Sequence, residues 1–478
     1  MNKQIRRVAF VTMIMFAMLL ANGTYMMIFR QTSLAAEPQN RRVRDAEFAQ
    51  NRGDILAAGK TVIAKTEPSK DRFKFQRVYP NGPVYAPVTG FYSYDHSRTA
   101  LESSYNSQLA GTDDALFVRR LVDRVTNKTP EGASVQTTIV PKIQEAAAEA
   151  LGDQKGAVLA LDPTTGAVLA MVTSPSYDPN EIASHDIDAA NKAYNRLAAD
   201  PDRPLANRAA REIYPPGSTF KLVTAAAALA DGKKPESVVD APNRLRLPGT
   251  NTFLPNSTNC GGTRVTITQA LKVSCNTAFA KLGLEVGEDK LRAQAQAFGF
   301  DRRHLADVGG VASQFPDEMN QAQLALSAIG QYDVAASPLQ MAMVTAGIAN
   351  DGVLMDPYLV SMVQTSDLKA IQTHKPEVLS TPMTPGDAKA LQAMMGIVVS
   401  QGTGTNARLP GVEVGGKTGT AQSDLARKPY AWFTSFAPLD DPKIAVAVIV
   451  EDADIPRTDI GGGRVAAPIA RAVMQAAL

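Results

Sequence analysis

One stretch near the N-terminus, residues 8–29, constrains the whole chain because it carries no charge and is almost wholly apolar. A stretch of this length is long enough for an α-helix to cross the hydrocarbon core of a bilayer. Lys3, Arg6 and Arg7 precede it, and positive charge on that side keeps the N-terminus in the cytoplasm. We therefore predict a cytoplasmic tail (residues 1–7) and a single-pass anchor in the cell membrane (residues 8–29), with the remainder extracytoplasmic.

A cleaved secretory signal is the alternative for this stretch, with a small-residue cleavage site at Ser33-Leu34-Ala35. The apolar run is longer than an ordinary signal core, which favours the anchor. With either interpretation residues 31–478 lie outside the cytoplasm, where disulfides persist. Cys260 and Cys275 are the only cysteines, so we predict a disulfide between them, with two buried free thiols as the alternative.

Composition excludes several classes of function. The chain has 478 residues, enough for two or three domains, and its net charge is +2. It has no basic stripe with interleaved aromatic residues, so we predict no nucleic-acid partner. Its four histidines are far apart in sequence and form no metal-spaced pair and no Ser-His-Asp set, so we expect no metal site. They are His96, His185, His304 and His374.

The strongest local signal for chemistry is Ser218 followed three residues later by Lys221. The Tyr-Pro-Pro-Gly sequence at 214–217 breaks any preceding element, and residues 222–230 are apolar and strongly helix-forming. We therefore predict that Ser218 opens a buried helix, with Lys221 on the same face. Free N–H groups and partial positive charge at a helix N-terminus suit a serine nucleophile with a lysine base.

The alternative for Ser218 is an N-cap serine beside a surface lysine. A second Ser-x-x-Lys pattern occurs at residues 366–369. It follows a polar stretch and precedes no long apolar helix, so we interpret it as a solvated loop.

Residues 265–283 contain the next candidate, because their apolar residues recur at helical spacing around Ser274 and Asn276. Polar side chains inside a buried helical hairpin need partners. The Ser-x-Asn pattern also occurs at 104–106 and 257–259, outside such a context, and we set those copies aside. The alternative for Ser274 is a buried, satisfied hydroxyl.

Residues 412–421 alternate in polarity and run into Lys417-Thr418-Gly419-Thr420, which predicts a strand. Gly419 within that strand would let a ligand or another segment approach the backbone closely.

This stretch also satisfies the phosphate-loop pattern at residues 411–418. A phosphate loop follows a strand and opens a helix, whereas the residues after Lys417 are poor helix starters. Together with the extracytoplasmic location, this excludes nucleotide binding.

Residues 30–134 read as a small α+β pedestal. Glycine-punctuated β-branched runs predict strands around 60–64 and across 73–94, and residues 101–106 look helical. The segment shows no nucleophile-and-base pattern, and it is too short to hold a second full enzyme domain as well.

Residues 135–478 form the main domain. The elements expected there are strands over 135–139, 432–437 and 444–450, a hairpin over 156–171, and helices over 141–151 and 466–478.

Three motifs, taken in order, closely resemble those of the penicillin-binding protein and serine β-lactamase superfamily. They are Ser218-x-x-Lys221, Ser274-x-Asn276 and Lys417-Thr418-Gly419. The flanking residues over about 51–478 look like the monofunctional, class B transpeptidases: Leu161-Asp162-Pro163-x-Thr165-Gly166, Ser174-Pro175-Ser176-Tyr177-Asp178-Pro179-Asn180, Tyr214-Pro215-Pro216-Gly217 and Trp432-Phe433.

The N-terminal part supports this resemblance. Residues 52–55 (Arg-Gly-Asp-Ile) and 101–106 look like the pedestal of that class, although residues 56–58 (Leu-Ala-Ala) replace its usual polar residues. The short pedestal and the two cysteines around Ser274 are most similar to the A-type penicillin-binding proteins of actinobacteria. The resemblance implies an α+β fold in which an antiparallel sheet flanked by helices joins an all-α part, a dimerisation-like pedestal and a transmembrane helix.

The resemblance also implies a D,D-transpeptidase that cross-links peptidoglycan stem peptides during cell growth or division. Ser218 would attack the carbonyl between two terminal D-alanines, and Lys221, kept neutral by burial and by Lys417, would take its proton. Ser274 would relay a proton to the leaving D-alanine. Asn276 would orient the lysine and the substrate amide.

The substrate carboxylate would be bound by the hydroxyls of Thr418 and Thr420, beside Gly419. The backbone N–H groups of Ser218 and Thr420 would form the oxyanion hole. β-Lactams would acylate Ser218, and no cofactor is needed. The implied partners are stem peptides, β-lactam antibiotics, a membrane glycan polymerase and other cell-wall or division proteins.

Competing functions use the same motifs. A D,D-carboxypeptidase or serine β-lactamase would let water deacylate the serine, but the anchor and pedestal favour transpeptidation and no glutamate stands out as a deacylating base. A non-catalytic β-lactam-binding scaffold is a further alternative; a sensor would need a cytoplasmic signalling part, for which residues 1–7 leave no room. The pedestal is too short for a bifunctional glycosyltransferase.

Overall fold

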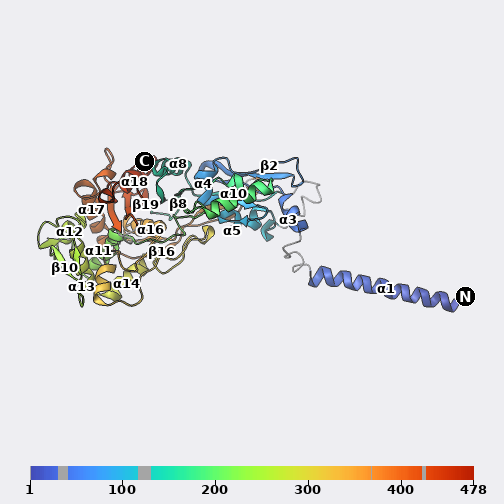
Figure 1. Cartoon of the computed structure of the whole chain (residues 1–478), viewed down its shortest axis with the longest axis horizontal. Helices are drawn as coiled ribbons and strands as arrows, with labels where there is room; N and C mark the ends of the chain where they lie inside the picture. Colours follow the sequence, from blue (N-terminus) through green and yellow to red (C-terminus); the bar gives the residue numbers. More distant parts are fainter. Residues whose placement is uncertain (1, 31–40, 117–130, 368, 422–426) are drawn as a thin grey trace.

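The computed structural model describes the chain except for residues 1, 31–40, 117–130, 368 and 422–426 (Figure 1). Helix α1 (Asn2–Phe29) contains the predicted anchor, and none of its apolar window is buried against the rest of the described chain. Its length and composition suit a membrane-spanning helix.

The pedestal elements are short and gather at one end of the folded body (Figure 1). They are α3 (Arg41–Phe48), β1 (Ile55–Leu56), β2 (Val62–Pro68), β3 (Phe75–Val78), α4 (Gly82–Thr89), β4 (Tyr92–Ser93), β5 (Ser97–Arg98), α5 (Ala100–Ser104) and α6 (Asn106–Leu109), with 3-10 turns at Ala58–Lys60 and Asp114–Leu116.

The pedestal shares a sheet with the main domain. The strand order of this six-stranded sheet is β15-β14-β6-β1-β2-β3. Strand β6 (Ser134–Thr137) pairs in parallel with β1 and antiparallel with β14 (Val360–Gln364), which in turn pairs with β15 (Ala370–Thr373). Backbone hydrogen bonds therefore cross the boundary that we predicted between residues 134 and 135.

One pedestal prediction was wrong. We expected strands over residues 73–94 with a turn at residues 79–82, but α4 (Gly82–Thr89) follows that turn in place of a strand. A proline in its first turn suits a helix start, and Tyr85 and Val88 are buried in the core. Tertiary burial has overridden the strand preference of this β-branched segment.

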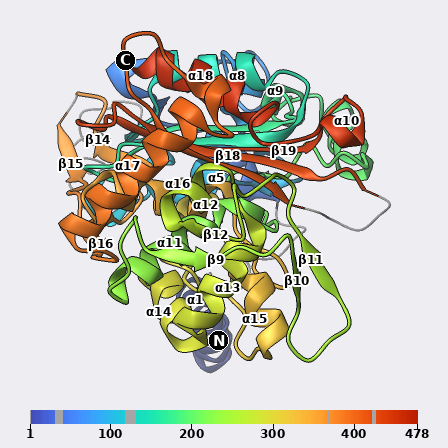
Figure 2. The ribbon, with the colours of Figure 1, turned by 90° about the vertical axis from the view of Figure 1, so that its left-hand side faces the viewer.

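The main domain is built on a five-stranded antiparallel sheet in the order β17-β18-β19-β7-β8. The predicted hairpin and strands are confirmed. Their bounds are β7 (Lys155–Leu161), β8 (Val168–Ser174), β17 (Gly415–Ala421), β18 (Tyr430–Ala437) and β19 (Ile444–Asp452). Helices α8 (Pro141–Leu151) and α18 (Ala466–Ala477) cover one face, and α16 (Pro338–Ala349) packs on the other (Figure 2).

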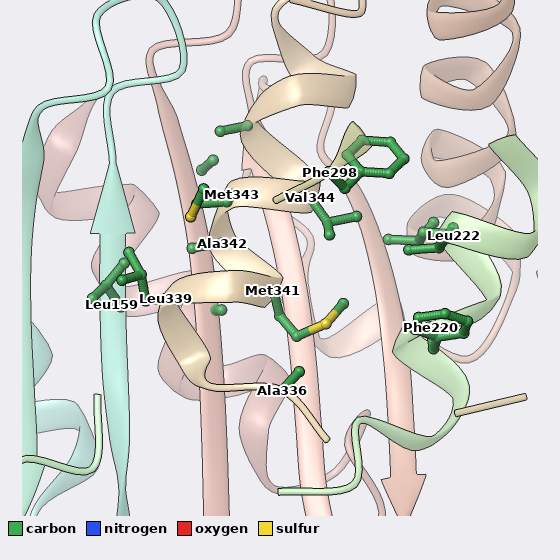
Figure 3. Packing of buried hydrophobic residues seen from close by; sticks show 14 of the residues in the cluster. Leu159, Phe220, Leu222, Phe298, Ala336, Leu339, Met341, Ala342, Met343 and Val344 are labelled. Atoms are coloured by element: carbon green, nitrogen blue, oxygen red, sulfur yellow. The ribbon is translucent and has the colours of Figure 1, made fainter. Parts of the chain in front are cut away.

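An all-α part lies beyond α16, as the predicted α+β architecture requires. Its helices are α11 (Lys221–Ala230), α12 (Ile267–Lys272), α13 (Asn276–Val286), α14 (Glu288–Ala297), α15 (Gln321–Ser327) and α17 (Pro385–Gln401). Every residue of α16 is buried, and this helix separates Leu159 of the sheet from Leu222 of α11 (Figure 3). The helix that carries Lys221 thus rests on the centre of the core.

Smaller elements complete the domain. Helices α9 (Pro179–Ile182) and α10 (Ile187–Ala199) lie beside the pedestal, and 3-10 turns occur at Gly217–Thr219, Ala306–Val308, Thr405–Ala407 and Arg457–Asp459. Three two-stranded ribbons pair β9 (Val238–Asp240) with β12 (Arg264–Thr266), β10 (Arg244–Arg246) with β11 (Phe253–Pro255), and β13 (Leu354–Met355) with β16 (Val378–Ser380).

Candidate active site

Ser218 lies in the 3-10 turn Gly217–Thr219, and the α-helix proper begins only at Lys221. The prediction that Ser218 opens the helix therefore places the α-helical start three residues too early. Gly217 has φ +52, and its N–H donates to the carbonyl of Gly330 (2.9 Å). A Cβ there would lie 3.0 Å from the carbonyl oxygen of Thr420, so glycine allows the turn to pack against β17.

The turn is held from behind by contacts that include two residues the sequence analysis did not single out, Arg208 and Glu451. The hydroxyl of Tyr214 donates to Glu451 Oε1 (2.7 Å), which also accepts from Arg208 Nε (2.8 Å). Trp432 Nε1 donates to the carbonyl of Pro215 (3.0 Å). The ends of β18 and β19 therefore fix the segment that leads into Ser218.

Two buried lysines meet at the hydroxyl of Ser274. Lys221 Nζ donates to the carbonyl of Ser274 (2.8 Å), to its Oγ (3.3 Å) and to Asn276 Oδ1 (2.7 Å). Lys417 Nζ donates to the same Oγ (2.9 Å) and to the carbonyl of Thr418 (2.8 Å). Residues more than a hundred positions apart are thus joined in one network of hydrogen bonds.

Residues 265–283 were expected to form a buried helical hairpin, and in the structure its two helices, α12 and α13, are separated at Ser274. β12 occupies its start, α12 ends at Lys272 and α13 begins at Asn276. Ser274 has φ +60, a left-handed conformation that costs free energy for any residue except glycine and that concentrates at functional sites. The break turns its hydroxyl toward both lysines instead of leaving it on a helix face.

A disulfide flanks this break. Cys275, next to Ser274, is bonded to Cys260, which precedes β12. The bond ties the segment after β11 to the turn between α12 and α13.

Both lysines are fully buried, and neither forms an ion pair with any residue that the structure describes. Burial, and then the nearby Lys417 cation, hold the pKa of Lys221 well below its ordinary value. Burial lowers the pKa of Lys417 to about 7. The lowered pKa values of the pair therefore favour a neutral amine that can accept a proton.

A cleft of about 480 Å³ opens over these groups. Ser218, Ser274, Asn276, Thr418 and Thr420, all from the three motifs and their continuation, line it together. Its other lining residues were not predicted: Leu254, Pro255, Ser257, Thr258, Val273, Leu326, Ile329, Gln331, Tyr332, Thr403, Gly461, Gly462 and Gly463.

Ser257 and Thr258 belong to a Ser-x-Asn copy that we set aside as a motif, and both line the cleft. The glycine triplet at 461–463 was the one available signal for the others, because consecutive glycines mark close backbone approach. A Cβ on Gly462 would lie 1.8 Å from the carbonyl oxygen of Trp432. Gly419 also permits close approach: a Cβ there would lie 2.9 Å from Thr219 Cγ2.

The remaining sequence candidates lie elsewhere. In the second Ser-x-x-Lys pattern, Ser366, Asp367 and Lys369 are exposed between β14 and β15. Lys417 is followed by further strand through Ala421, which confirms that this segment is not a phosphate loop. None of the four histidines lines the cleft in the described part of the chain.

Comparison with known proteins agrees with this geometry. The transpeptidase-domain model of penicillin-binding proteins matches residues 156–475, and the dimerisation-domain model of penicillin-binding protein A matches residues 52–135. The peptidoglycan D,D-transpeptidase PbpA of Mycolicibacterium smegmatis is 45% identical over 100% of this chain and 99% of its own. The protein of the same name from Mycobacterium tuberculosis is 43% identical, with the same coverage.

Solved structures show the same fold. Penicillin-binding protein A from M. tuberculosis, as its ceftriaxone acyl-enzyme complex, superposes with a TM-score of 0.88 at 43% identity, covering 91% of this chain and all of that one. Its penicillin G acyl-enzyme gives 0.85 at the same identity, over 90% and 99%. The resemblance to class B enzymes of the actinobacterial A type is confirmed. The chain belongs to the penicillin-binding protein transpeptidase family.

Proposed function

We propose that this protein is a peptidoglycan D,D-transpeptidase that cross-links stem peptides through an acyl-enzyme at Ser218. The proposal rests mainly on one observation: two buried lysines contact the hydroxyl of Ser274. Ser274 and Ser218 line the same open cleft. The relatives named peptidoglycan D,D-transpeptidase align along essentially their whole length, and the similar solved structures are β-lactam acyl-enzymes.

In the first half-reaction Ser218 attacks the carbonyl carbon between the two terminal D-alanines. Lys221 takes the hydroxyl proton, because its lowered pKa favours the neutral amine that a proton acceptor must be. The hydrogen bonds of Lys221 go to Ser274 and Asn276, which hold the amine in place below the cleft floor.

Ser274 then passes a proton to the departing D-alanine. Its hydroxyl lies within hydrogen-bonding distance of both lysine amines, so it can accept a proton from one side while it donates on the other. Asn276 binds Lys221 through Oδ1 and donates through Nδ2 to the carbonyl of Pro255 (3.2 Å). It thereby fixes the orientation of the amine and of the cleft wall.

The oxyanion and the substrate carboxylate are bound along β17. The backbone N–H groups of Ser218 and Thr420 form the oxyanion hole, which requires that the nucleophile turn pack against β17, as it does at Gly217. The hydroxyls of Thr418 and Thr420 line the cleft and receive the carboxylate.

The acyl-enzyme is resolved by an amine from a second stem peptide. No aspartate or glutamate lines the cleft among the described residues, which supports slow hydrolysis. β-Lactams acylate Ser218 in the same way and remain attached.

Helix α1 anchors the enzyme as a single-pass protein in the cell membrane, with the cleft in the extracytoplasmic space. The wall precursor polymer lies there, so the enzyme works beside a membrane glycan polymerase and other proteins of wall growth and division. The anchor and the pedestal are the surfaces that such partners would contact.

The test is labelling of the full-length chain in detergent with a fluorescent penicillin, followed by a chase of about an hour. Wild type should give a stable band that Ser218→Ala abolishes. Ser366→Ala, in the second Ser-x-x-Lys pattern, is the matched control and should label fully. A band that survives Ser218→Ala would refute the nucleophile, and a band that decays within seconds would indicate a β-lactamase.

A further inference from the structure

Thr403 is a cleft residue to which neither the motifs nor the proposed mechanism gives a role. It follows α17 and precedes the 3-10 turn Thr405–Ala407. Its Oγ1 lies 2.7 Å from Oγ1 of Thr418, and both residues line the cleft. This contact joins the all-α part to the strand that carries Lys417.

The backbone holds Thr403 firmly in this place. A Cβ on Gly402 would lie 2.5 Å from the carbonyl oxygen of Lys272, and one on Gly463 would lie 2.2 Å from the carbonyl oxygen of Thr403. Glycine is therefore required at both positions, because another segment of backbone comes too close for a side chain. Thr403 is fixed between the end of α12 and the glycine segment before α18.

The charge of the cleft makes its hydroxyl donors important. No arginine or lysine side chain lines the cleft in the described part of the chain. Lys417 is buried beneath it and donates to Ser274 and to the carbonyl of Thr418. The side-chain donors near β17 that can meet a carboxylate within the cleft are thus hydroxyls.

Two hydroxyls at this distance share one hydrogen bond, in which one oxygen donates and the other accepts. The accepting hydroxyl keeps its own hydrogen, and apart from this pair neither oxygen has another hydrogen-bond partner among the described residues. When Thr403 donates to Thr418, the free O–H of the pair is that of Thr418, and hydrogen bonds to a charged acceptor are stronger than those between neutral groups.

We propose that Thr403 is a positioning residue that makes the enzyme selective for acyl donors carrying a carboxylate, by orienting the Thr418 hydroxyl toward that group. The inference rests on the proposed transpeptidase function and adds a determinant of its donor site. Without the Thr403 hydroxyl, Thr418 would rotate freely and bind a carboxylate less well.

The test compares two thioester donors with the same acyl-D-alanyl group, whose leaving groups end in a carboxylate or in a carboxamide. In the full-length protein, Thr403→Val should lower kcat/KM for the carboxylate donor about 10-fold, mainly through KM. The carboxamide donor should change less than about 2-fold, since a neutral amide gains less from that hydrogen bond.

Two further variants control the test. Thr403→Ser keeps the hydroxyl and should restore the preference for the carboxylate. Thr405→Val makes the same change two residues away, outside the cleft lining, and should leave both donors unaffected. The role of Thr403 would be overturned if Thr403→Val lowered kcat/KM equally for the two donors. It would also be overturned if kcat/KM for the carboxylate donor did not change.

Failure of the proposed function has a different signature. In that case wild type would turn over neither thioester and would not be labelled by penicillin at Ser218, which would overturn both proposals. A wild type that is acylated at Ser218 but whose donor preference survives Thr403→Val would overturn the Thr403 proposal alone.

Discussion

The pedestal and the cleft both bury cations, but they treat them in opposite ways. In the pedestal, Arg52 and Arg77 each bond Glu102 at 2.6 Å, and all three side chains are nearly inaccessible to solvent. In the cleft, Lys221 and Lys417 are fully buried with hydroxyl, amide and carbonyl oxygens around them and without a carboxylate partner in the described chain.

The pKa values show what this difference means. Burial alone would raise the pKa of Glu102, but Arg77 and Arg52 together hold it below its ordinary value, so its charge is secured. In the cleft burial acts without compensation, and the pKa of each lysine falls. Paired charges hold the pedestal together, whereas unpaired amines near their neutral state are suited to move protons.

The largest effect should come from replacing Lys221 by methionine. Because the proton acceptor is lost, acylation by penicillin should slow about 1,000-fold. Stability should stay level or increase, since an apolar side chain of similar length replaces an unpaired buried amine. Stopped-flow acylation and urea unfolding measure the two quantities.

A Lys221→Met protein that is acylated at the wild-type rate would show that the proton goes elsewhere. A large loss of stability would show that the amine is structural, as the pedestal charges are.

Glu102→Gln should have the reverse pattern. It leaves two buried guanidinium groups without their anion, which should cost about 3–5 kcal/mol of unfolding free energy. The acylation rate of the folded fraction should be unchanged, because Glu102 lies in the pedestal. Glu67→Gln is the matched control: its pair with Lys65 is solvent-exposed, so the loss should be below about 1 kcal/mol.

The sequence predicted those features of the molecule that short stretches of residues reveal. The strands of the central sheet were readable from their apolar β-branched runs, and the reactive groups Ser218, Ser274 and Lys417 from short motifs. In each case neighbouring residues contain the information, through periodicity or through the residue types that the chemistry needs.

The rest depends on long-range packing. The segment of α4 looks like strand and becomes helix only because the core buries Tyr85 and Val88. The hydroxyl of Ser274, at the break between α12 and α13, contacts two lysines that lie far away in sequence. Thr403 reaches the cleft through glycines whose close contacts lie on other elements, so its own neighbours give no sign of its place.

The next largest predicted effect is the loss of stability when the disulfide is removed. On the cleft side, the Cys260–Cys275 bond closes a loop beside Ser274 with a sequence separation of 15. Replacing both cysteines by serine should cost about 3 kcal/mol in the chain-entropy picture. Urea unfolding of the double variant, and of reduced wild type, should give matching losses; an unchanged midpoint would show that the loop is held by packing.

The smallest predicted effect is the change in unfolding free energy for each unit of pH. Lys417 titrates near 7 when folded and near 10.5 when unfolded. Between these values the unfolded chain binds a proton that the folded chain does not, so stability should rise with pH by at most about 1.4 kcal/mol per unit for this group.

Glu102 affects the unfolding free energy at acidic pH. Its folded pKa is below 4.5, so its contribution is present above 4.5 and is lost as pH falls through the folded value. Unfolding at several pH values should show both slopes. Because the pKa of Lys221 is also lowered, Lys417→Met should reduce the alkaline slope without removing it, and should leave the acid slope unchanged. An alkaline slope of wild-type size in that variant would assign it to other groups.

The most direct test of the account is the pH profile of Ser218 acylation, measured in single turnovers with a penicillin. If burial holds the pKa of Lys221 well below its ordinary value, the acylation rate should reach its plateau well below pH 10.4 and change little above that point. If Lys221 kept an ordinary pKa near 10.4, the rate should climb about tenfold per pH unit up to that value. That continued rise would contradict the claim that the cleft holds an unpaired amine ready to accept the serine proton.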